Sequence, residues 1–138
     1  MTDAGGLLFV YGSLRPGAPP HPLAERFWAE AAHLGRARTV GALHWITDSE
    51  GAAYPGLVES GDAADIVIGD LFRLPEAPAL LALLDAYEDE GVDYLRRTAA
   101  VTLEDGRTLM AWVYVRHAAA KRGARIAGGD FLKAQAQG

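Results

Sequence analysis

The segment between Tyr94 and Val115 constrains the fold more than any other part of the sequence. Two strand-like runs, Tyr94–Leu103 and Thr108–Val115, flank a Glu-Asp-Gly-Arg tetrapeptide at 104–107. An Asp-Gly pair between such runs is typical of a tight hairpin turn, because the twist of that turn matches the twist of the two strands. The sequence therefore predicts an antiparallel hairpin, and a sheet that contains it is not purely parallel.

Four further strands are predicted from short runs that are apolar or alternate between apolar and polar residues. These runs are Leu7–Tyr11, Ala37–Ile46, Tyr54–Glu59 and Asp65–Leu74. Together with the hairpin they give six strands. The strands do not alternate regularly with helices, so the order predicts an α+β fold with a mixed, curled sheet.

Two helices are predicted from apolar residues that recur at helical spacing. The first begins at Pro22 and reaches about Leu34, where Gly35 is placed to end it. The second has Pro78 in its first turn and runs to about Asp89. A last short helix is expected from Phe131, with Asp130 as its cap.

Length and charge exclude several classes of protein. A chain of 138 residues has the usual size of one domain, which we expect to span residues 1–138. Thirteen basic against 18 acidic residues give a net charge of −5, which argues against nucleic-acid binding. The absence of cysteine excludes disulfides, thiolate zinc sites and thiol nucleophiles. The apolar runs are too short to span a bilayer and the first residues carry no basic signal region, so we expect a cytoplasmic protein without a membrane partner.

Most common catalytic motifs are missing. The four histidines lie on separate predicted elements and never at metal-ligand spacing, which favours surface or loop positions for His21, His33, His44 and His117. Ser13 is not part of a Gly-x-Ser-x-Gly elbow, so a serine hydrolase has little support. The glycines between Gly123 and Gly129 lack the context of a nucleotide-binding loop and are explained by a turn.

The loop after the first strand is a candidate anion site. At Tyr11-Gly12-Ser13-Leu14 a buried strand ends and several backbone N–H groups lose their ladder partners. Such groups, next to a glycine that permits close approach, form concave sites for a carboxylate. The alternative interpretation of the same four residues is an ordinary strand-to-loop turn.

Glu88 is a candidate general base. On a helical wheel of about 100° per residue with Leu80 at the origin, Glu88 falls at about 80°, between Leu84 and Leu81. An acidic residue on an apolar face is uncommon unless it is paired or functional. Burial and the position in the last helical turn would both raise the pKa of Glu88 toward the range of a general base. The alternative is a carboxylate that points to solvent or pairs with an arginine, Arg96 or Arg97.

The sequence resembles the γ-glutamylcyclotransferase-like proteins, specifically their small AIG2-like branch, in several motifs that follow one another along the chain. The resemblance covers nearly the whole chain and rests on a set of seven segments. These are Phe9–Gly17, Tyr54–Leu57, Ile68–Phe72, Leu84–Glu88, Tyr94–Arg97, Ala111–Val115 and Gly128–Phe131.

The resemblance implies a barrel-like sheet with flanking helices and an intramolecular reaction. In that family the loop matching Tyr11, Gly12, Ser13 and Leu14 holds the glutamyl group by backbone amides, and the glutamate matching Glu88 accepts a proton. The α-amine of a γ-glutamyl group then attacks its own γ-carbonyl, which releases an amine and 5-oxoproline. The implied partner is thus a small γ-glutamyl compound, and no metal or organic cofactor is required.

Three points stay open in the sequence. The family usually has glycine directly after the glutamate, whereas Asp89 follows here and glycine comes only at Gly91, so a shifted register would place Glu90 at the site. Spacing and wheel position favour Glu88. Tyr94 and Tyr114 are candidate pocket residues, with half-buried strand aromatics as the alternative. An enzyme is the favoured function, and a binding or scaffold protein without turnover on the same fold is the alternative.

Overall fold

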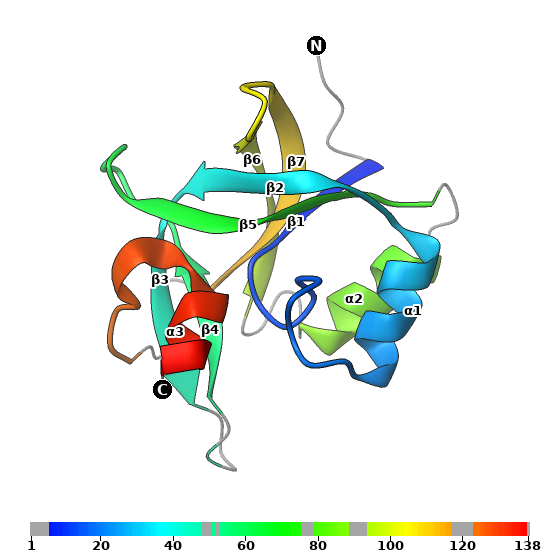
Figure 1. Ribbon diagram of the computed structural model, residues 1–138, viewed down its shortest axis with the longest axis horizontal. Coiled ribbons are helices and arrows are strands. Elements are labelled where there is room, and N and C mark those ends of the chain that lie inside the picture. Colours follow the sequence, from blue (N-terminus) through cyan, green and yellow to red (C-terminus); the bar gives the residue numbers. More distant parts are fainter. Residues whose placement is uncertain are drawn as a thin grey trace.

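The computed structural model describes residues 6–47, 51, 53–75, 79–88, 94–116 and 123–137. These residues form seven strands, three α-helices and one 3-10 helix, η2 (Ala127–Gly129) (Figure 1). The strands are β1 (Leu7–Val10), β2 (Ala32–Val40), β3 (Ala42–Thr47), β4 (Ala53–Val58), β5 (Ile66–Arg73), β6 (Tyr94–Leu103) and β7 (Thr108–Arg116). The α-helices are α1 (Pro22–Glu30), α2 (Ala79–Tyr87) and α3 (Phe131–Gln137).

Five of the strands close into a barrel. Their order is β1-β5-β2-β6-β7, and β7 returns to pair with β1, parallel, through Leu8 and Trp112. The other four pairings in the ring are antiparallel. The prediction of an α+β fold with a mixed, curled, barrel-like sheet is confirmed, with seven strands in place of about six.

The remaining two strands, β3 and β4, form a hairpin attached to the barrel. β4 pairs parallel with the end of β7, through Leu57 and Val115. The predicted hairpin of β6 and β7 is confirmed, with continuous pairing from Tyr94–Arg116 to Thr102–Thr108. Gly106 in its turn has φ +93°, a conformation that glycine adopts without strain.

One predicted strand, Ala37–Ile46, is wrong because the chain leaves the barrel in its middle. β2 ends at Val40 and β3 begins at Ala42, and each pairs with different neighbours. A Cβ at Gly41 would lie 3.0 Å from Leu57 Cδ2, so the chain passes tightly against β4 at this point. Apolar alternation continues through Gly41, which is why the sequence alone does not reveal the change of sheet partner.

The predicted end of the first helix is also wrong. α1 stops at Glu30, four residues before Leu34, because β2 already pairs with β5 from Ala32 onward. Gly35, expected to end the helix, instead lies in β2 at a shift of register and has φ +142°. Pairing with a neighbouring strand outweighs a weak helical preference over these few residues.

The other helices agree better with the sequence. α2 lies within the predicted range, whose ends at Pro78 and Asp89 fall outside the described residues. The expected short helix from Phe131 is confirmed, and an Oδ1 of Asp130 accepts the N–H of Lys133 at 3.2 Å. No helix in the described ranges is long and apolar enough to cross a membrane.

Two apolar clusters lie on opposite faces of β1. Leu7, Phe9 and Tyr11 belong to a first cluster that includes side chains from all five barrel strands. Leu8 and Val10 belong to a second cluster, which contains Phe27 of α1 and Leu80 and Leu84 of α2. β1 is therefore buried on both faces, which explains its continuous apolar sequence. Figure 1 shows α1 and α2 together on one side of the barrel and α3 near β3 and β4.

Candidate functional site

A pocket of about 580 Å³ opens where β1 ends. Its wall contains the loop after β1, the end of α2, part of β4, and one face of α3. The residues predicted for the site that line it are Tyr11, Gly12, Ser13, Leu14, Glu88, Tyr94 and Tyr114. The fold thus brings all seven predicted residues to one cavity from four separate stretches of the chain, and their roles remain predictions.

Two backbone N–H groups of the loop are not used by any hydrogen bond among the described residues. Its own hydrogen bonds run from the N–H of Arg15 to the carbonyl of Gly12, at 3.0 Å, and from the N–H of Ala18 to the carbonyl of Arg15, at 2.9 Å. Within the described part of the chain, no hydrogen bond uses the N–H of Ser13 or Leu14. Both residues line the pocket, so these groups are suited to receive a carboxylate.

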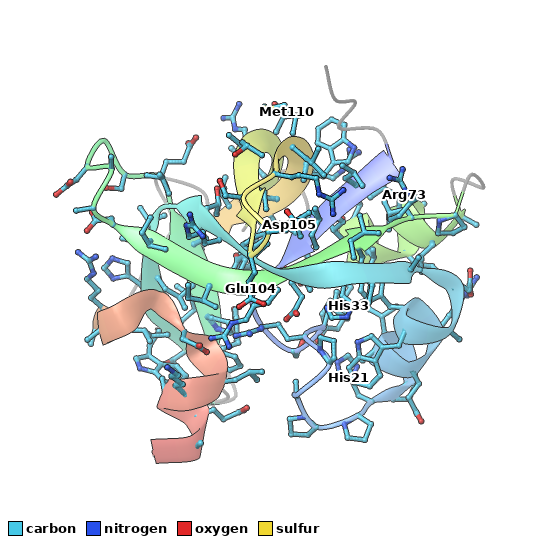
Figure 2. The ribbon with its side chains drawn as sticks, turned by 45° about the horizontal axis from the view of Figure 1, so that its top comes forward. His21, His33, Arg73, Glu104, Asp105 and Met110 are labelled. Atoms are coloured by element: carbon cyan, nitrogen blue, oxygen red, sulfur yellow. The ribbon has the colours of Figure 1, made fainter. Side chains whose placement is uncertain are left out.

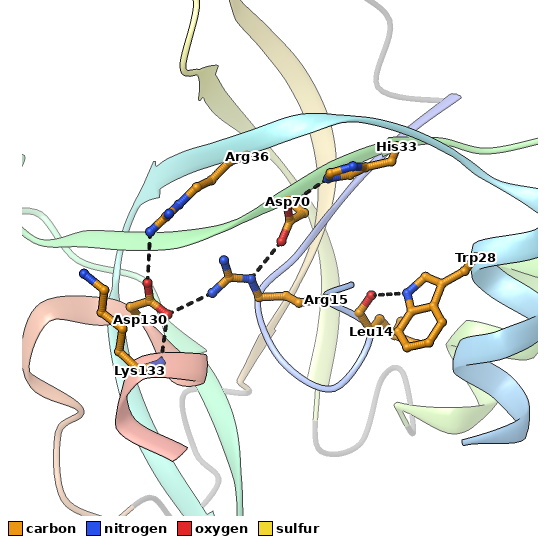
Figure 3. Close-up of polar contacts among 8 residues, drawn as sticks. All are labelled: Leu14, Arg15, Trp28, His33, Arg36, Asp70, Asp130 and Lys133. Atoms are coloured by element: carbon orange, nitrogen blue, oxygen red, sulfur yellow. Dashed lines mark hydrogen bonds and ion pairs between the residues drawn. The ribbon is translucent and has the colours of Figure 1, made fainter. Parts of the chain in front are cut away.

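A buried charge cluster holds this loop (Figure 3). The Nε of Arg15 donates to Asp70 at 2.8 Å, and its Nη1 donates to Asp130 at 2.9 Å. Asp70 belongs to β5 and Asp130 immediately precedes α3, so a single guanidinium joins the loop to two distant elements. His33 and Arg36 of β2 contact the same two carboxylates at 2.9 and 3.2 Å.

Opposing influences act on the pKa of Asp130 in this cluster, and those that lower it prevail. Burial raises the pKa of this carboxyl, but the N–H of Lys133 and the guanidinium groups of Arg15 and Arg36 outweigh burial and leave the pKa lowered. Asp130 therefore remains ionised at neutral pH and keeps its pairing with Arg15.

On the opposite side of the loop, the indole N–H of Trp28 donates to the carbonyl of Leu14 at 2.7 Å.

Gly12 is required by a neighbouring strand. A Cβ at this position would lie 2.8 Å from Cγ of Pro55, which belongs to β4 and also lines the pocket. The proline ring is rigid, so any side chain at position 12 would push the loop and β4 apart. Packing between two walls of the pocket thus explains the glycine, and the expected close approach of a carboxylate to the backbone stays a prediction.

Glu88 lies at the end of α2 and is half-buried at the pocket. Its N–H donates to the carbonyl of Leu84 at 3.0 Å, which continues the last helical turn by one residue. Leu80 and Leu84 are fully buried, as the wheel requires, whereas Leu83 and Tyr87 on the other side of the predicted apolar arc are 39% and 52% exposed. The core-facing direction is thus rotated toward Glu88. Glu90, the alternative base, lies outside the described residues.

Three of the tyrosines that line the pocket, Tyr11, Tyr94 and Tyr114, use their hydroxyl groups to hold its walls together. The hydroxyl of Tyr11 donates to the carbonyl of Tyr114 at 2.6 Å and accepts the N–H of Leu57 at 3.1 Å. Tyr94 donates to the carbonyl of Pro55 at 3.0 Å. The hydroxyl of Tyr114 donates to Oδ1 of Asp85 at 2.6 Å.

All three phenol groups stay protonated near neutral pH. Burial raises the pKa of Tyr11, Tyr94 and Tyr114, and the charge of Glu88 raises each of them further. The guanidinium of Arg116, 5.4 Å from the centroid of the Tyr94 ring, acts in the opposite direction on the pKa of Tyr11 and Tyr94 but does not outweigh burial.

The described histidines serve the fold. The Nδ1 of His21 accepts the N–H of Ala24 and caps α1, and His33 pairs with Asp70 (both histidines are labelled in Figure 2). The Nδ1 of His44 lies 3.0 Å from the carbonyl of Gly123. His117 lies outside the described residues. In the ranges that the structure describes, no three histidine or carboxylate side chains are grouped as metal ligands.

Several residues of the site were not predicted from the sequence. Tyr54 and Tyr87 line the pocket, and Phe131 and Gln135 of α3 close another side of it. Arg15, which holds the loop, stood within a recognised motif but had no assigned role. Its partner Asp130 was identified as a helix cap only, since no local pattern reveals a contact across 115 residues of sequence.

One cavity is lined by Glu88 and by Ser13 and Leu14, whose N–H groups make no hydrogen bond within the described part of the chain. The carboxylate site and the proton acceptor expected of these residues stay predictions. The volume lies within the range of small-molecule sites, about 300–1,000 Å³. The size of the cavity therefore fits a small molecule.

Solved structures share this fold. An AIG2-like protein from Mus musculus is 28% identical with a TM-score of 0.67, and the match covers 83% of this chain and 79% of the mouse chain. YkqA from Bacillus subtilis is 26% identical with a TM-score of 0.69, and the match covers 94% of this chain but only 40% of YkqA. This chain thus spans about two fifths of the length of YkqA. A structure named gamma-glutamyl cyclotransferase, at 18% identity and a TM-score of 0.63, shares the fold over 87% of this chain and 69% of its own.

Comparison of the sequence with protein families identifies the same family as the solved structures suggest. No curated protein matches the chain significantly. The model described as "Gamma-glutamyl cyclotransferase, AIG2-like" matches residues 8–133, which include the pocket loop, α2 and the start of α3. Because this match covers nearly the whole chain, and solved structures of AIG2-like proteins share the barrel, the chain belongs to the AIG2-like γ-glutamyl cyclotransferase family.

Proposed function

We propose that this protein is a γ-glutamyl cyclotransferase that converts a γ-glutamyl amine or γ-glutamyl amino acid to 5-oxoproline and the free amine. The observation that carries the proposal is the single cavity lined by both the Ser13–Leu14 amides and Glu88. One γ-glutamyl group has an α-carboxylate and an α-amine on the same carbon, so its two polar groups match the two features of the pocket.

The loop binds the substrate in this proposal. The N–H groups of Ser13 and Leu14 receive the α-carboxylate, and they need no conformational change because Arg15 and Trp28 already hold the loop. Preorganised amides bind an anion without an ordering cost at the moment of binding. The remainder of the substrate extends along the aromatic side of the pocket, past Tyr54 and Tyr87.

Glu88 carries the proton in the reaction. Its carboxylate takes a proton from the α-ammonium group, and the freed nitrogen attacks the γ-carbonyl carbon to form the ring C–N bond. As the tetrahedral intermediate collapses, the C–N bond to the leaving group breaks and Glu88 returns the first proton to the departing nitrogen. The ring nitrogen then loses its second proton, again through Glu88, so that the lactam N–H remains and the amine leaves as an ammonium ion. No water is consumed. Both reacting groups belong to one molecule, so positioning supplies a large part of the rate.

The experiment is a panel of γ-glutamyl compounds incubated with the purified protein, with 5-oxoproline release as the readout. The panel contains γ-glutamyl amino acids and γ-glutamyl alkylamines, with α-glutamyl isomers as the matched control. We expect release from γ-glutamyl compounds only, since an α-linked isomer cannot close the same ring. Binding of γ-glutamyl compounds without any release would instead support the non-catalytic alternative.

A further inference from the structure

The last turn of α2 has one charged anchor. The helix sequence is Ala-Leu-Leu-Ala-Leu-Leu-Asp-Ala-Tyr, so Asp85 and Tyr87 are its only polar side chains. Apolar contacts through Leu80 and Leu84 hold the helix against the barrel, but such contacts are non-directional and do not fix its rotation. Asp85, which lies three residues before Glu88, supplies directional contacts to this turn, beside the stacking of Tyr87 on His21 at 6.0 Å between ring centroids.

Asp85 makes three hydrogen bonds to two barrel strands. Its Oδ1 accepts from Nε of Arg96 at 2.8 Å and from the hydroxyl of Tyr114 at 2.6 Å, and its Oδ2 accepts from Nη2 of Arg96 at 3.1 Å. Arg96 belongs to β6 and Tyr114 to β7. The two-pronged contact with Arg96 fixes the orientation of the carboxylate as well as its distance.

The partners of Asp85 are themselves held in place. The guanidinium of Arg96 lies over the ring of Trp112, 4.4 Å from its centroid. Tyr114 is buried, and its carbonyl accepts the hydroxyl of Tyr11 at 2.6 Å. Since Tyr11 directly precedes Gly12, hydrogen bonds run from the last turn of α2 through β7 to the first residue of the anion loop.

We propose that Asp85 is a positioning residue, which sets the rotation and depth of the last turn of α2 and thereby aims Glu88 at a substrate held by the loop. This inference rests on the proposed function. Asp85 touches no substrate itself and acts through Glu88. A displacement of about 1 Å at a reacting group can cost on the order of 100-fold in rate, so a tether of this kind controls turnover.

The test compares steady-state kinetics of wild type with Asp85→Asn and Tyr114→Phe. Asp85→Asn weakens all three bonds, and Tyr114→Phe removes one hydroxyl. We expect kcat to fall at least about 10-fold in Asp85→Asn and less in Tyr114→Phe, with the affinity for 5-oxoproline changed less than about 3-fold, since the loop is untouched. Asp65→Asn is the matched control, because Asp65 also pairs with an arginine, Arg125 at 2.6 Å, but does not line the pocket. Its kcat should equal that of wild type.

A double-mutant cycle with Glu88→Gln separates this proposal from the proposed function. If Asp85 acts through Glu88, Asp85→Asn has no further effect on the residual rate of Glu88→Gln. Absence of 5-oxoproline release by the wild type would overturn the function itself, whereas full activity of Glu88→Gln would overturn Glu88 as the base and, with it, the positioning role. Loss of activity in Glu88→Gln, combined with wild-type kcat in Asp85→Asn, would overturn only the positioning role. A fall in 5-oxoproline affinity parallel to the fall in kcat would also overturn it, because that result indicates general disruption of the pocket.

Discussion

The two sides of the pocket are held by different means. On the loop side, Arg15, Asp70 and Asp130 have side chains only 6%, 9% and 8% exposed. On the helix side, Asp85 and Arg96 are 26% and 22% exposed. The buried Arg15 cluster joins the loop to β5 and to the residue before α3, whereas the Asp85–Arg96 pair joins the last turn of α2 to β6 of the barrel. The comparison indicates that the Tyr11–Leu14 loop is held as firmly as the core, while the turn that carries Glu88 is positioned by a few less buried contacts.

The largest effect on stability is expected for Arg15→Met. Removing the guanidinium leaves two buried carboxylates without their shared partner, which typically costs about 3–5 kcal/mol. Denaturant unfolding of wild type and variant measures the difference. Arg26→Met is the control, because the Arg26–Glu30 pair is exposed. Equal stability losses in the two variants would mean that the loop side is no better anchored than the surface.

Gly12→Ala tests the contact between the two pocket walls. The new Cβ would lie 2.8 Å from Cγ of Pro55, and such overpacking costs about 1–3 kcal/mol. The same displacement should weaken 5-oxoproline binding, because the Ser13 and Leu14 amides follow directly. Gly61→Ala, with open space around its Cβ, provides the comparison by calorimetry and denaturation. Unchanged stability and binding in Gly12→Ala would contradict the packing described here.

The smallest effect expected is a pH dependence of stability on the loop side. The lowered pKa of Asp130 in the folded protein means that its contribution is fully present above the unfolded pKa, about 3.9, and is lost as pH falls through the folded pKa. Wild type should therefore lose stability below about pH 4 more steeply than Asp130→Asn. Denaturant midpoints across that range measure both slopes. Identical slopes would show that ionisation of Asp130 does not contribute to the pH dependence of stability.

The sequence predicts best where local chemistry decides the structure. The hairpin of β6 and β7 follows from its Asp-Gly turn, and the start of α3 follows from a cap at Asp130. Prediction from the sequence fails where pairing between distant strands determines the structure. Nothing local distinguishes Gly41, where the chain leaves the barrel, from a residue inside a strand, and nothing near residue 31 shows that β5 will pair with the chain from there.

The candidate site follows the same division. The Tyr11–Leu14 loop and Glu88 are recognisable from strand-end chemistry and from one helical wheel, and the fold brings both to one cavity. The contacts that hold the loop and the last turn of α2 in place were not recognisable from the sequence. Arg15 reaches Asp70 and Asp130 across 55 and 115 residues, and Asp85 reaches Tyr114 across 29. Such contacts depend on closure of the barrel, which no single segment of the sequence encodes.

The central claim is that Glu88 accepts the proton on a substrate held by the loop, and turnover by Glu88→Gln tests it most directly. The amide keeps the shape of the side chain but cannot accept the proton, so release of 5-oxoproline should fall on the order of 100-fold or more. Its affinity for 5-oxoproline should match that of wild type. Glu90→Gln, which tests the alternative register, should stay active. An active Glu88→Gln beside an inactive Glu90→Gln would assign the base to Glu90, and two active variants would contradict general-base catalysis by either residue.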